Sequence, residues 1–193
     1  MIRDSTGNLY GTTAGYGTDV GRCQAAFYLG CGVVFRLDAA STYTLLHTFT
    51  GQDGAIPFAG VTRNSAGSLF GTTYIGGSIK GNFRALDGCG VVFEVDATGK
   101  ESVVYTFPSD GKHGESPYYA GVIRDPAGNL YGTTQSGGIA NNGVVFNLDQ
   151  TCKQTVLYAF TGGMEGFSPG GGLVRDSAGN LYGTTTEGWH RPV

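Results

Sequence analysis

The chain has 193 residues, of which 40% are hydrophobic and 14% charged, and its 12 basic and 15 acidic side chains give a formal net charge of −3. This balance excludes the basic footprint that duplex nucleic acid or an anionic membrane surface requires. Apolar runs such as Val33–Phe35 are far too short for a membrane-spanning helix, and no cationic start followed by an apolar run resembles a signal peptide, so we expect neither nucleic-acid binding nor membrane insertion.

The first repeat unit contains four short segments that favour β-strands. They are rich in Val, Tyr, Phe and Thr, are bounded by Gly, Asn or Asp, and fall in chain order at residues 1–3, 8–13, 32–35 and 43–49. Such segments are typical of short antiparallel strands. Between the first two, Asp4 to Asn8 has the Asp and Gly chemistry of a tight hairpin turn, so we expect Asp4 to anchor that turn.

The same order of segments returns along the chain. The second strand returns as Leu-Tyr/Phe-Gly-Thr-Thr, with its leucines 60, 61 and 51 residues apart at Leu9, Leu69, Leu130 and Leu181. The third strand returns as Gly-Val-Val-Phe at residues 32–35, 90–93 and 143–146. The fourth strand also occurs three times, ending at Phe49, Phe107 and Phe160, so the last repeat has only its first two strands.

Four short strands per repeat predict an all-β, β-propeller-like fold of about four four-stranded blades of ~50–60 residues, the last one incomplete. A solenoid coil is usually shorter, and a sandwich has no reason to repeat its own sequence. We expect one domain over residues 1–193, with repeats at roughly 1–58, 59–119 and 120–170 and a partial repeat at 171–193. The ring either closes as a minimal four-bladed form or is completed by a homo-oligomer through the incomplete blade.

The string Gly-Asn-Leu-Tyr-Gly-Thr-Thr, followed by Gly-Gly, Gly-Val-Val-Phe and Phe-Thr-Gly, resembles the GloVer-type tandem repeat of bacterial surface and secreted proteins over nearly the whole chain. The resemblance implies an extracellular, repeat-built protein of largely undefined activity. The Asp-x-x-Gly-Asn-Leu-Tyr rhythm is also similar to the blades of gluconolactonase-like propellers, which are calcium-dependent lactone hydrolases.

Strand alternation places two sets of loops on one face of such a fold. The variable loops join the second and third strands (residues 14–31, 74–89 and 135–142), and the inter-repeat loops lead from the fourth strand to the next repeat (residues 50–58, 108–119 and 161–171). Alignment of the inter-repeat loops on Gly-x-x-Pro puts Asp53, His113 and Glu165 at equivalent positions. Several carboxylates at one opening suit Ca²⁺, and an adjacent imidazole suits a general base.

The leading functional prediction is therefore a calcium-dependent hydrolase of small lactones, of the sugar-lactone or acyl-homoserine-lactone type, acting on a small-molecule substrate. Its catalytic residues would be His113, Asp53 and Glu165, and its Ca²⁺ ligands Asp53, Glu165, Glu115 and Asp110. A simpler interpretation is that the acidic residue before Gly caps a turn and that His113 is an ordinary surface residue. The alternative function is a non-catalytic extracellular module that binds glycans or proteins through Tyr16, Phe27, Tyr28, Tyr118 and Tyr119.

Four cysteines bear on the compartment. Cys23 and Cys31 are eight residues apart in one variable loop, which favours a disulfide between them, although loop thiols are equally compatible with the spacing. A disulfide would fit an extracytoplasmic or secreted protein. Cys89 and Cys152 have no evident partner in the sequence.

Overall fold

The computed structural model describes residues 1–17, 23–25, 28–77 and 88–188, and it confirms an all-β fold of blade-like antiparallel sheets. Blade 1 contains β1 (Ile2–Arg3), β2 (Leu9–Thr13), β5 (Val33–Leu37) and β6 (Tyr43–Thr48). Blade 2 contains β7 (Thr62–Arg63), β8 (Leu69–Thr73), β9 (Val91–Val95) and β10 (Glu101–Thr106). Blade 3 contains β12 (Ile123–Arg124), β13 (Leu130–Thr134), β15 (Val144–Leu148) and β16 (Gln154–Ala159).

In the described part of the partial fourth repeat, β18 (Val174–Arg175) and β19 (Leu181–Tyr182) form a C-terminal hairpin. Short strand pairs lie in the loops, and a 3-10 helix, η1 (Gly163–Glu165), precedes the last of them. These pairs are β3 (Gln24–Ala25) with β4 (Tyr28–Leu29), β11 (Gly114–Glu115) with β14 (Ser136–Gly137), and β17 (Phe167–Pro169) with β20 (Thr185–Glu187). The predicted order of strands, complete in three repeats and truncated in the fourth, is thus the order observed.

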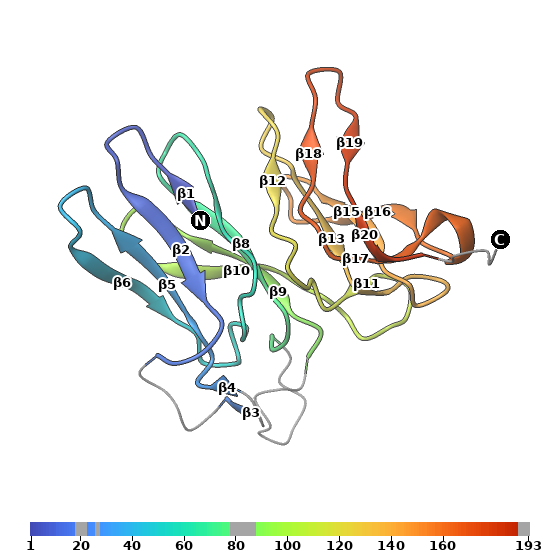
Figure 1. Cartoon of the computed structure of the whole chain (residues 1–193), viewed down its shortest axis with the longest axis horizontal. Coiled ribbons are helices and arrows are strands. Elements are labelled where there is room, and N and C mark those ends of the chain that lie inside the picture. The colour runs from blue at the N-terminus through green and yellow to red at the C-terminus, as the bar shows by residue number, and fades with distance from the viewer. Residues whose placement is uncertain (18–22, 26–27, 78–87, 189–193) are drawn as a thin grey trace.

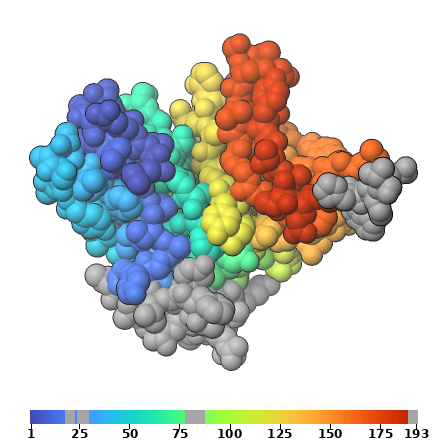
Figure 2. Space-filling view, viewed as in Figure 1, coloured from blue at the N-terminus to red at the C-terminus, as the bar shows by residue number. Residues whose placement is uncertain are grey.

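The blades follow one another side by side in chain order, from blade 1 in blue to the C-terminal hairpin in red (Figure 1). Figure 2 shows them as adjoining slabs that spread apart toward the end where the turn between β18 and β19 lies. The hydrophobic core is divided between the slabs: one cluster joins blades 1 and 2, and a second joins blades 2 and 3. Each blade therefore depends on its neighbour to bury its faces.

Phenylalanine rings lie at the centre of both clusters. Phe49, directly after β6, meets Phe93 of β9 edge to face at 5.0 Å, and Phe107 meets Phe146 of β15 in the same way at 5.2 Å. All four side chains are at most 2% exposed. Edge-to-face pairs of this kind stabilise beyond their buried area, so these two pairs of rings hold blade 1 to blade 2 and blade 2 to blade 3.

The recurring glycine of the second strand is explained by the same rings. Gly71 lies opposite Phe93 in the register of β8 and β9, and a Cβ at Gly71 would be 2.5 Å from the Phe93 ring. Gly132 stands in the same relation to Phe146, with a separation of 2.7 Å. The Gly of Leu-Tyr-Gly-Thr-Thr and the Phe of Gly-Val-Val-Phe are therefore one packing unit, in which the ring covers a strand position that has no side chain.

The predicted turn anchors are confirmed. Asp4 Oδ1 accepts hydrogen bonds from the amides of Thr6 and Asn8 at 3.0 and 2.9 Å, and Oδ2 accepts one from Tyr10 Oη at 3.0 Å. Asp125 repeats this pattern with Asn129 and Tyr131. The carboxylate oxygens of these aspartates therefore accept hydrogen bonds within the turns that they close.

Backbone pairings fix each inter-repeat loop to the variable loop of the next repeat. Ala55 bridges to Ile75, β11 pairs with β14, and β17 pairs with β20 after the last second strand. The residues directly before each loop's proline, Ile56, Ser116 and Ser168, share a φ of 53 to 59°. The prediction that both loop sets lie on one face is confirmed by these pairings.

Candidate functional site

Asp53, His113 and Glu165 hold equivalent places in the three inter-repeat loops, as the Gly-x-x-Pro alignment predicts, but each bonds to its own repeat. Asp53 Oδ2 lies 2.9 Å from His47 Nε2 of β6, and Asp53 Oδ1 accepts hydrogen bonds from the Thr50 amide and hydroxyl at 2.7 and 2.9 Å. Burial would raise the pKa of Asp53, yet the hydrogen bonds from His47 and Thr50 outweigh burial and lower it. Asp53 is therefore ionised and directed toward the edge strand of blade 1.

Glu165 repeats this arrangement on blade 3. Its carboxylate accepts hydrogen bonds from the hydroxyls of Tyr158 in β16 and of Thr161, which are the equivalents of His47 and Thr50. Glu165 thus also faces the edge strand of its own sheet. The alternative interpretation, in which an acidic residue before Gly closes a turn, describes what Asp53 and Glu165 do here.

The second inter-repeat loop differs because Pro108 replaces the threonine. His113 Nδ1 lies 2.5 Å from Asp110 Oδ2, and the pair is well exposed. Backbone amides of His113 and Lys112 lower the pKa of Asp110 to about 2. The Glu115 carboxylate accepts a long hydrogen bond of 3.3 Å from the Gly111 amide.

Within the described part of the chain, no hydrogen bond or ion pair joins any two of Asp53, His113 and Glu165. The structure instead brings Asp53 together with two residues that the sequence analysis did not choose. Ligand atoms of His47, Asp53 and Glu101 all lie within 4.8 Å of one another, and among the described residues this is the one such group of three His, Cys, Asp or Glu side chains. The predicted ligands Glu165, Glu115 and Asp110 are outside it.

Glu101 begins β10, so this cluster spans the junction between blades 1 and 2. Burial raises the pKa of Glu101 to about 7, with the His47 charge opposing and the Asp53 charge adding to the increase. The sequence carried a signal for one of the two missed residues: His47 stands where both other repeats have a tyrosine, Tyr105 and Tyr158. The position of Glu101 differs in all three repeats, with Tyr43 and Gln154 in the others, and so gave no such signal.

Aromatic side chains form a second group on the face that carries the variable and inter-repeat loops, which we call the loop face. Phe58 follows the proline of the first inter-repeat loop, Tyr118 and Tyr119 follow that of the second, and Tyr74 begins a variable loop. The Tyr118 and Tyr119 ring centroids are 4.0 Å apart, and Phe58 lies 4.9 to 5.7 Å from the other three rings. We call Phe58, Tyr74, Tyr118 and Tyr119 the aromatic cluster.

Tyr119 is the most exposed member of the aromatic cluster. Tyr119 is 52% exposed, while the other three side chains are partly buried. In the third inter-repeat loop, Gly170 and Gly171 take the place of these aromatics. Of the other aromatic contacts predicted from sequence, Tyr16 is 69% exposed but has no ring contact with the cluster, whereas Phe27 and the Tyr28 side chain lie outside the described residues.

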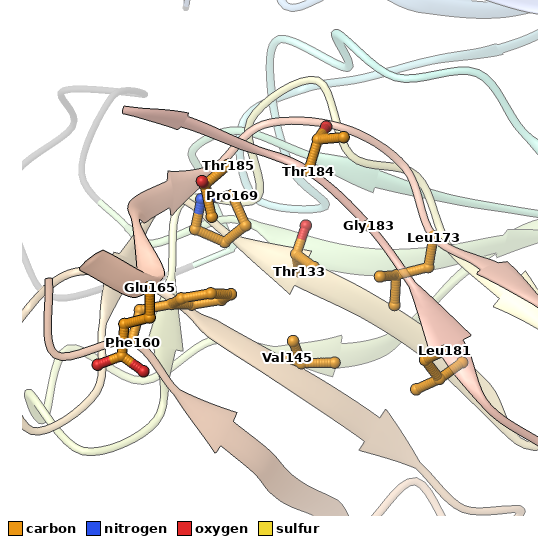
Figure 3. Close-up of a pocket in the computed structure, with 10 residues that line it drawn as sticks. All are labelled: Thr133, Val145, Phe160, Glu165, Pro169, Leu173, Leu181, Gly183, Thr184 and Thr185. Atoms are coloured by element: carbon orange, nitrogen blue, oxygen red, sulfur yellow. The ribbon is translucent and has the colours of Figure 1, made fainter. Parts of the chain in front are cut away.

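A cavity of about 280 Å³ lies between blade 3 and the C-terminal hairpin. Phe160 and Glu165 lie at one end of it and Leu173 and Leu181 at the other, with Thr133 and Val145 between them (Figure 3). Because Glu165 already bonds Tyr158 and Thr161, the cavity offers mainly apolar walls with threonine hydroxyls.

A disulfide joins Cys23 to Cys31, as the spacing favours, and Cys89 and Cys152 are free thiols. Cys89 is the equivalent of Cys31 in the second repeat. Burial raises the pKa of its thiol, followed by the effect of the Glu115 charge, so the thiolate is disfavoured.

Comparison with models of protein families shows which family these repeats belong to. The family model described as the Gloeobacter/Verrucomicrobia repeat matches residues 1–191. The chain belongs to this repeat family. Membership in the Gloeobacter/Verrucomicrobia repeat family confirms the GloVer-type resemblance and accounts for the recurring strands of all three blades. No curated protein matches the chain. No helix in the described part of this family member is long and apolar enough to cross a membrane.

Proposed function

We propose that the protein is a non-catalytic, extracytoplasmic module that binds glycans through the aromatic cluster. The observation that carries this proposal is the gathering of four aromatic rings from two inter-repeat loops and one variable loop at one place on the loop face. Aromatic rings offer rigid, flat apolar surfaces on which the C–H faces of a pyranose stack, and tyrosine adds a polar group at its rim.

Tyr119 is the central contact of this proposal. Its ring is half exposed, and its hydroxyl accepts a hydrogen bond from the Tyr118 hydroxyl at 3.2 Å. Two hydroxyl groups therefore lie beside the rings, where they can bond a sugar. Its backbone has a φ of 52°, a region that bulky residues rarely adopt. Such a conformation is often retained where a side chain has a functional task. The disulfide between Cys23 and Cys31 supports an oxidising compartment.

Affinity electrophoresis against a panel of soluble polysaccharides tests the proposal. We expect retardation by at least one polysaccharide, and at least a tenfold loss of affinity in Tyr119→Ala, because one of the stacking surfaces is removed. Tyr43→Ala is the matched control, since Tyr43 is similarly exposed at 57% but lies on β6 beside Phe35. Retardation that Tyr119→Ala leaves unchanged, or none by any polysaccharide, would contradict glycan binding through this cluster.

Calcium-dependent hydrolysis of small lactones is the second proposal. It is supported by the equivalent positions of Asp53, His113 and Glu165 on the loop face, although each bonds within its own repeat. The measurement is turnover of sugar lactones and acyl-homoserine lactones with Ca²⁺ and with a chelator. Hydrolysis that needs Ca²⁺ and is lost in His113→Ala would support it, whereas folded protein that is inactive on the whole panel would eliminate it.

A further inference from the structure

Two equivalent polar positions come close together at each junction between complete blades. They are the fifth residue of one fourth strand and the first residue of the next fourth strand. Between blades 2 and 3 these residues are Tyr105 and Gln154, and Tyr105 Oη donates a hydrogen bond to Gln154 Oε1 at 2.8 Å. Both side chains are neutral, so this junction needs no counter-charge.

Between blades 1 and 2 the same positions hold His47 and Glu101, and Asp53 completes the cluster from the inter-repeat loop. The side chains of His47 and Asp53 are only 18% and 16% exposed. Glu101 Oε1 is buried and has no hydrogen-bond partner. An imidazole and a carboxylate thus stand in place of the neutral pair, and Asp53 adds a second carboxylate. A buried carboxylate oxygen without a partner costs free energy unless a cation or donor reaches it.

We propose that His47, Asp53 and Glu101 bind one divalent transition-metal ion of the zinc type, which joins blade 1 to blade 2. The donor set carries this assignment: one imidazole nitrogen and two carboxylate oxygens, supplied by β6, by an inter-repeat loop and by β10. Imidazole with carboxylate is a usual set for Zn²⁺ and its first-row neighbours, whereas Ca²⁺ and Mg²⁺ take oxygen ligands alone.

The spacing of the ligand atoms suits such an ion. Zinc–nitrogen and zinc–oxygen distances of about 2.0–2.2 Å place the ligands of a tetrahedral ion roughly 3.5 Å apart. The three ligand atoms lie within 4.8 Å of one another, and His47 Nε2 is 2.9 Å from Asp53 Oδ2. Small side-chain rotations therefore bring all three to bonding distance, and a water molecule would take the fourth position.

The test uses the full chain, freed of metal with a chelator and then titrated calorimetrically with Zn²⁺, with Co²⁺ as a spectroscopic probe. We expect one ion per chain, a Co²⁺ absorption band typical of mixed nitrogen and oxygen ligands, and no competition from excess Ca²⁺. At a hundredfold excess of free Zn²⁺ over Kd, the melting temperature should rise by about 5 to 10 °C, because the ion binds the folded chain.

The repeats themselves supply the decisive variant. His47→Tyr combined with Glu101→Gln installs the residues of the next junction, so this variant should fold and lose Zn²⁺ binding. Glu101→Gln alone is the second variant, and we expect at least a hundredfold weaker affinity with the fold kept. His113→Ala and His190→Ala remove the other two of the chain's three histidines and should leave affinity unchanged.

Three results would overturn the proposal: no stoichiometric Zn²⁺ binding by the wild-type chain, the same affinity in folded Glu101→Gln, or equal affinity for Ca²⁺. In the first case the cluster is a proton-sharing group without a metal. The result is independent of glycan binding, because Tyr119→Ala should retain the metal site and Glu101→Gln should retain the aromatic cluster.

Discussion

The junction between two complete blades and the junction between blade 3 and the C-terminal hairpin are built from the same repeat but close differently. Phe49 and Phe107 each meet a phenylalanine of the following blade and are almost completely buried. Phe160 is their equivalent, is only partly buried, and has its ring contact with Tyr158 of its own blade. The cavity of about 280 Å³ lies beside it.

A hydrogen bond shows the same difference. Thr12 Oγ1 donates to the Ala59 carbonyl at 2.7 Å, and Thr72 Oγ1 donates to the Ala120 carbonyl at 2.9 Å, each across a junction. Thr133 is the equivalent in blade 3, and its buried hydroxyl has no partner. A cation–π contact is retained: Arg175 of the hairpin lies over the Tyr131 ring at 5.9 Å, much as Arg63 lies over Tyr10 at 5.5 Å.

The hydrophobic core forms between neighbouring blades and not within a single blade. First and second strands alone position the turn end of the hairpin, but the third and fourth strands supply the Val and Phe side chains that fill the space between slabs. The cavity is therefore what a junction looks like when those strands are not part of it.

The largest expected effect is the loss of stability when a phenylalanine ring is removed, and it should differ between the two kinds of junction. Phe93→Ala should lower the free energy of unfolding by about 3–5 kcal/mol, because it leaves a cavity between blades 1 and 2. Phe160→Ala should cost about 1–2 kcal/mol, since the ring is partly exposed and already borders empty space. Urea unfolding measures both, and equal losses would show that the third junction is packed as tightly as the first.

An intermediate effect comes from the threonine hydroxyls. Thr133→Val should stabilise the protein by about 1 kcal/mol because it removes a buried hydroxyl that has no partner. Thr72→Val should destabilise it by about 1 kcal/mol because the bond to Ala120 is lost. Thermal unfolding of the two variants compares them directly, and changes of the same sign would refute the proposed difference.

The smallest effect concerns the turns between first and second strands, which have the same hydrogen bonds in blade 3 and in the C-terminal hairpin. Asp125→Asn should cost about 0.5 kcal/mol at neutral pH, since the amide bonds Asn129 and Tyr131 less strongly than the carboxylate does. The second repeat has this change naturally, together with the loss of both donor side chains: Asn64, Ser68 and Phe70 stand for Asp125, Asn129 and Tyr131.

The pH dependence of that difference has a definite sign. Burial opposes ionisation of Asp125, but hydrogen bonds from Asn129 and Tyr131 lower its pKa in the folded protein. The stabilisation is therefore present above the unfolded value of 3.8 and is lost as pH falls through the lower folded pKa. Urea midpoints of wild type and Asp125→Asn should converge in acid, and a gap that widens below pH 4 would contradict this account.

The fold was largely predictable because its determinants are local and repeated. Gly-Val-Val-Phe and Leu-Tyr-Gly-Thr-Thr specify paired strands, and Asp4 specifies a turn, without knowledge of any distant contact. The site was less predictable. Equivalent sequence positions correctly aligned Asp53 with Glu165, but the edge strand toward which they point is set by His47 and Tyr158, several residues away. The meeting of His47 with Glu101 depends on how two blades stack, which no single repeat encodes.

The pairing of each inter-repeat loop with the following variable loop has an evolutionary consequence. The pairing fixes only the base of the variable loop, at Ile75 or at β14, so the length beyond that base is unconstrained by the sheets. The chain itself uses this freedom, since residues 14–31 and 135–142 differ more than twofold in length between otherwise matching repeats. New recognition surfaces can thus be grafted onto this scaffold by exchanging loop tips, in the manner of antibody hypervariable segments, while the strands beneath stay the same.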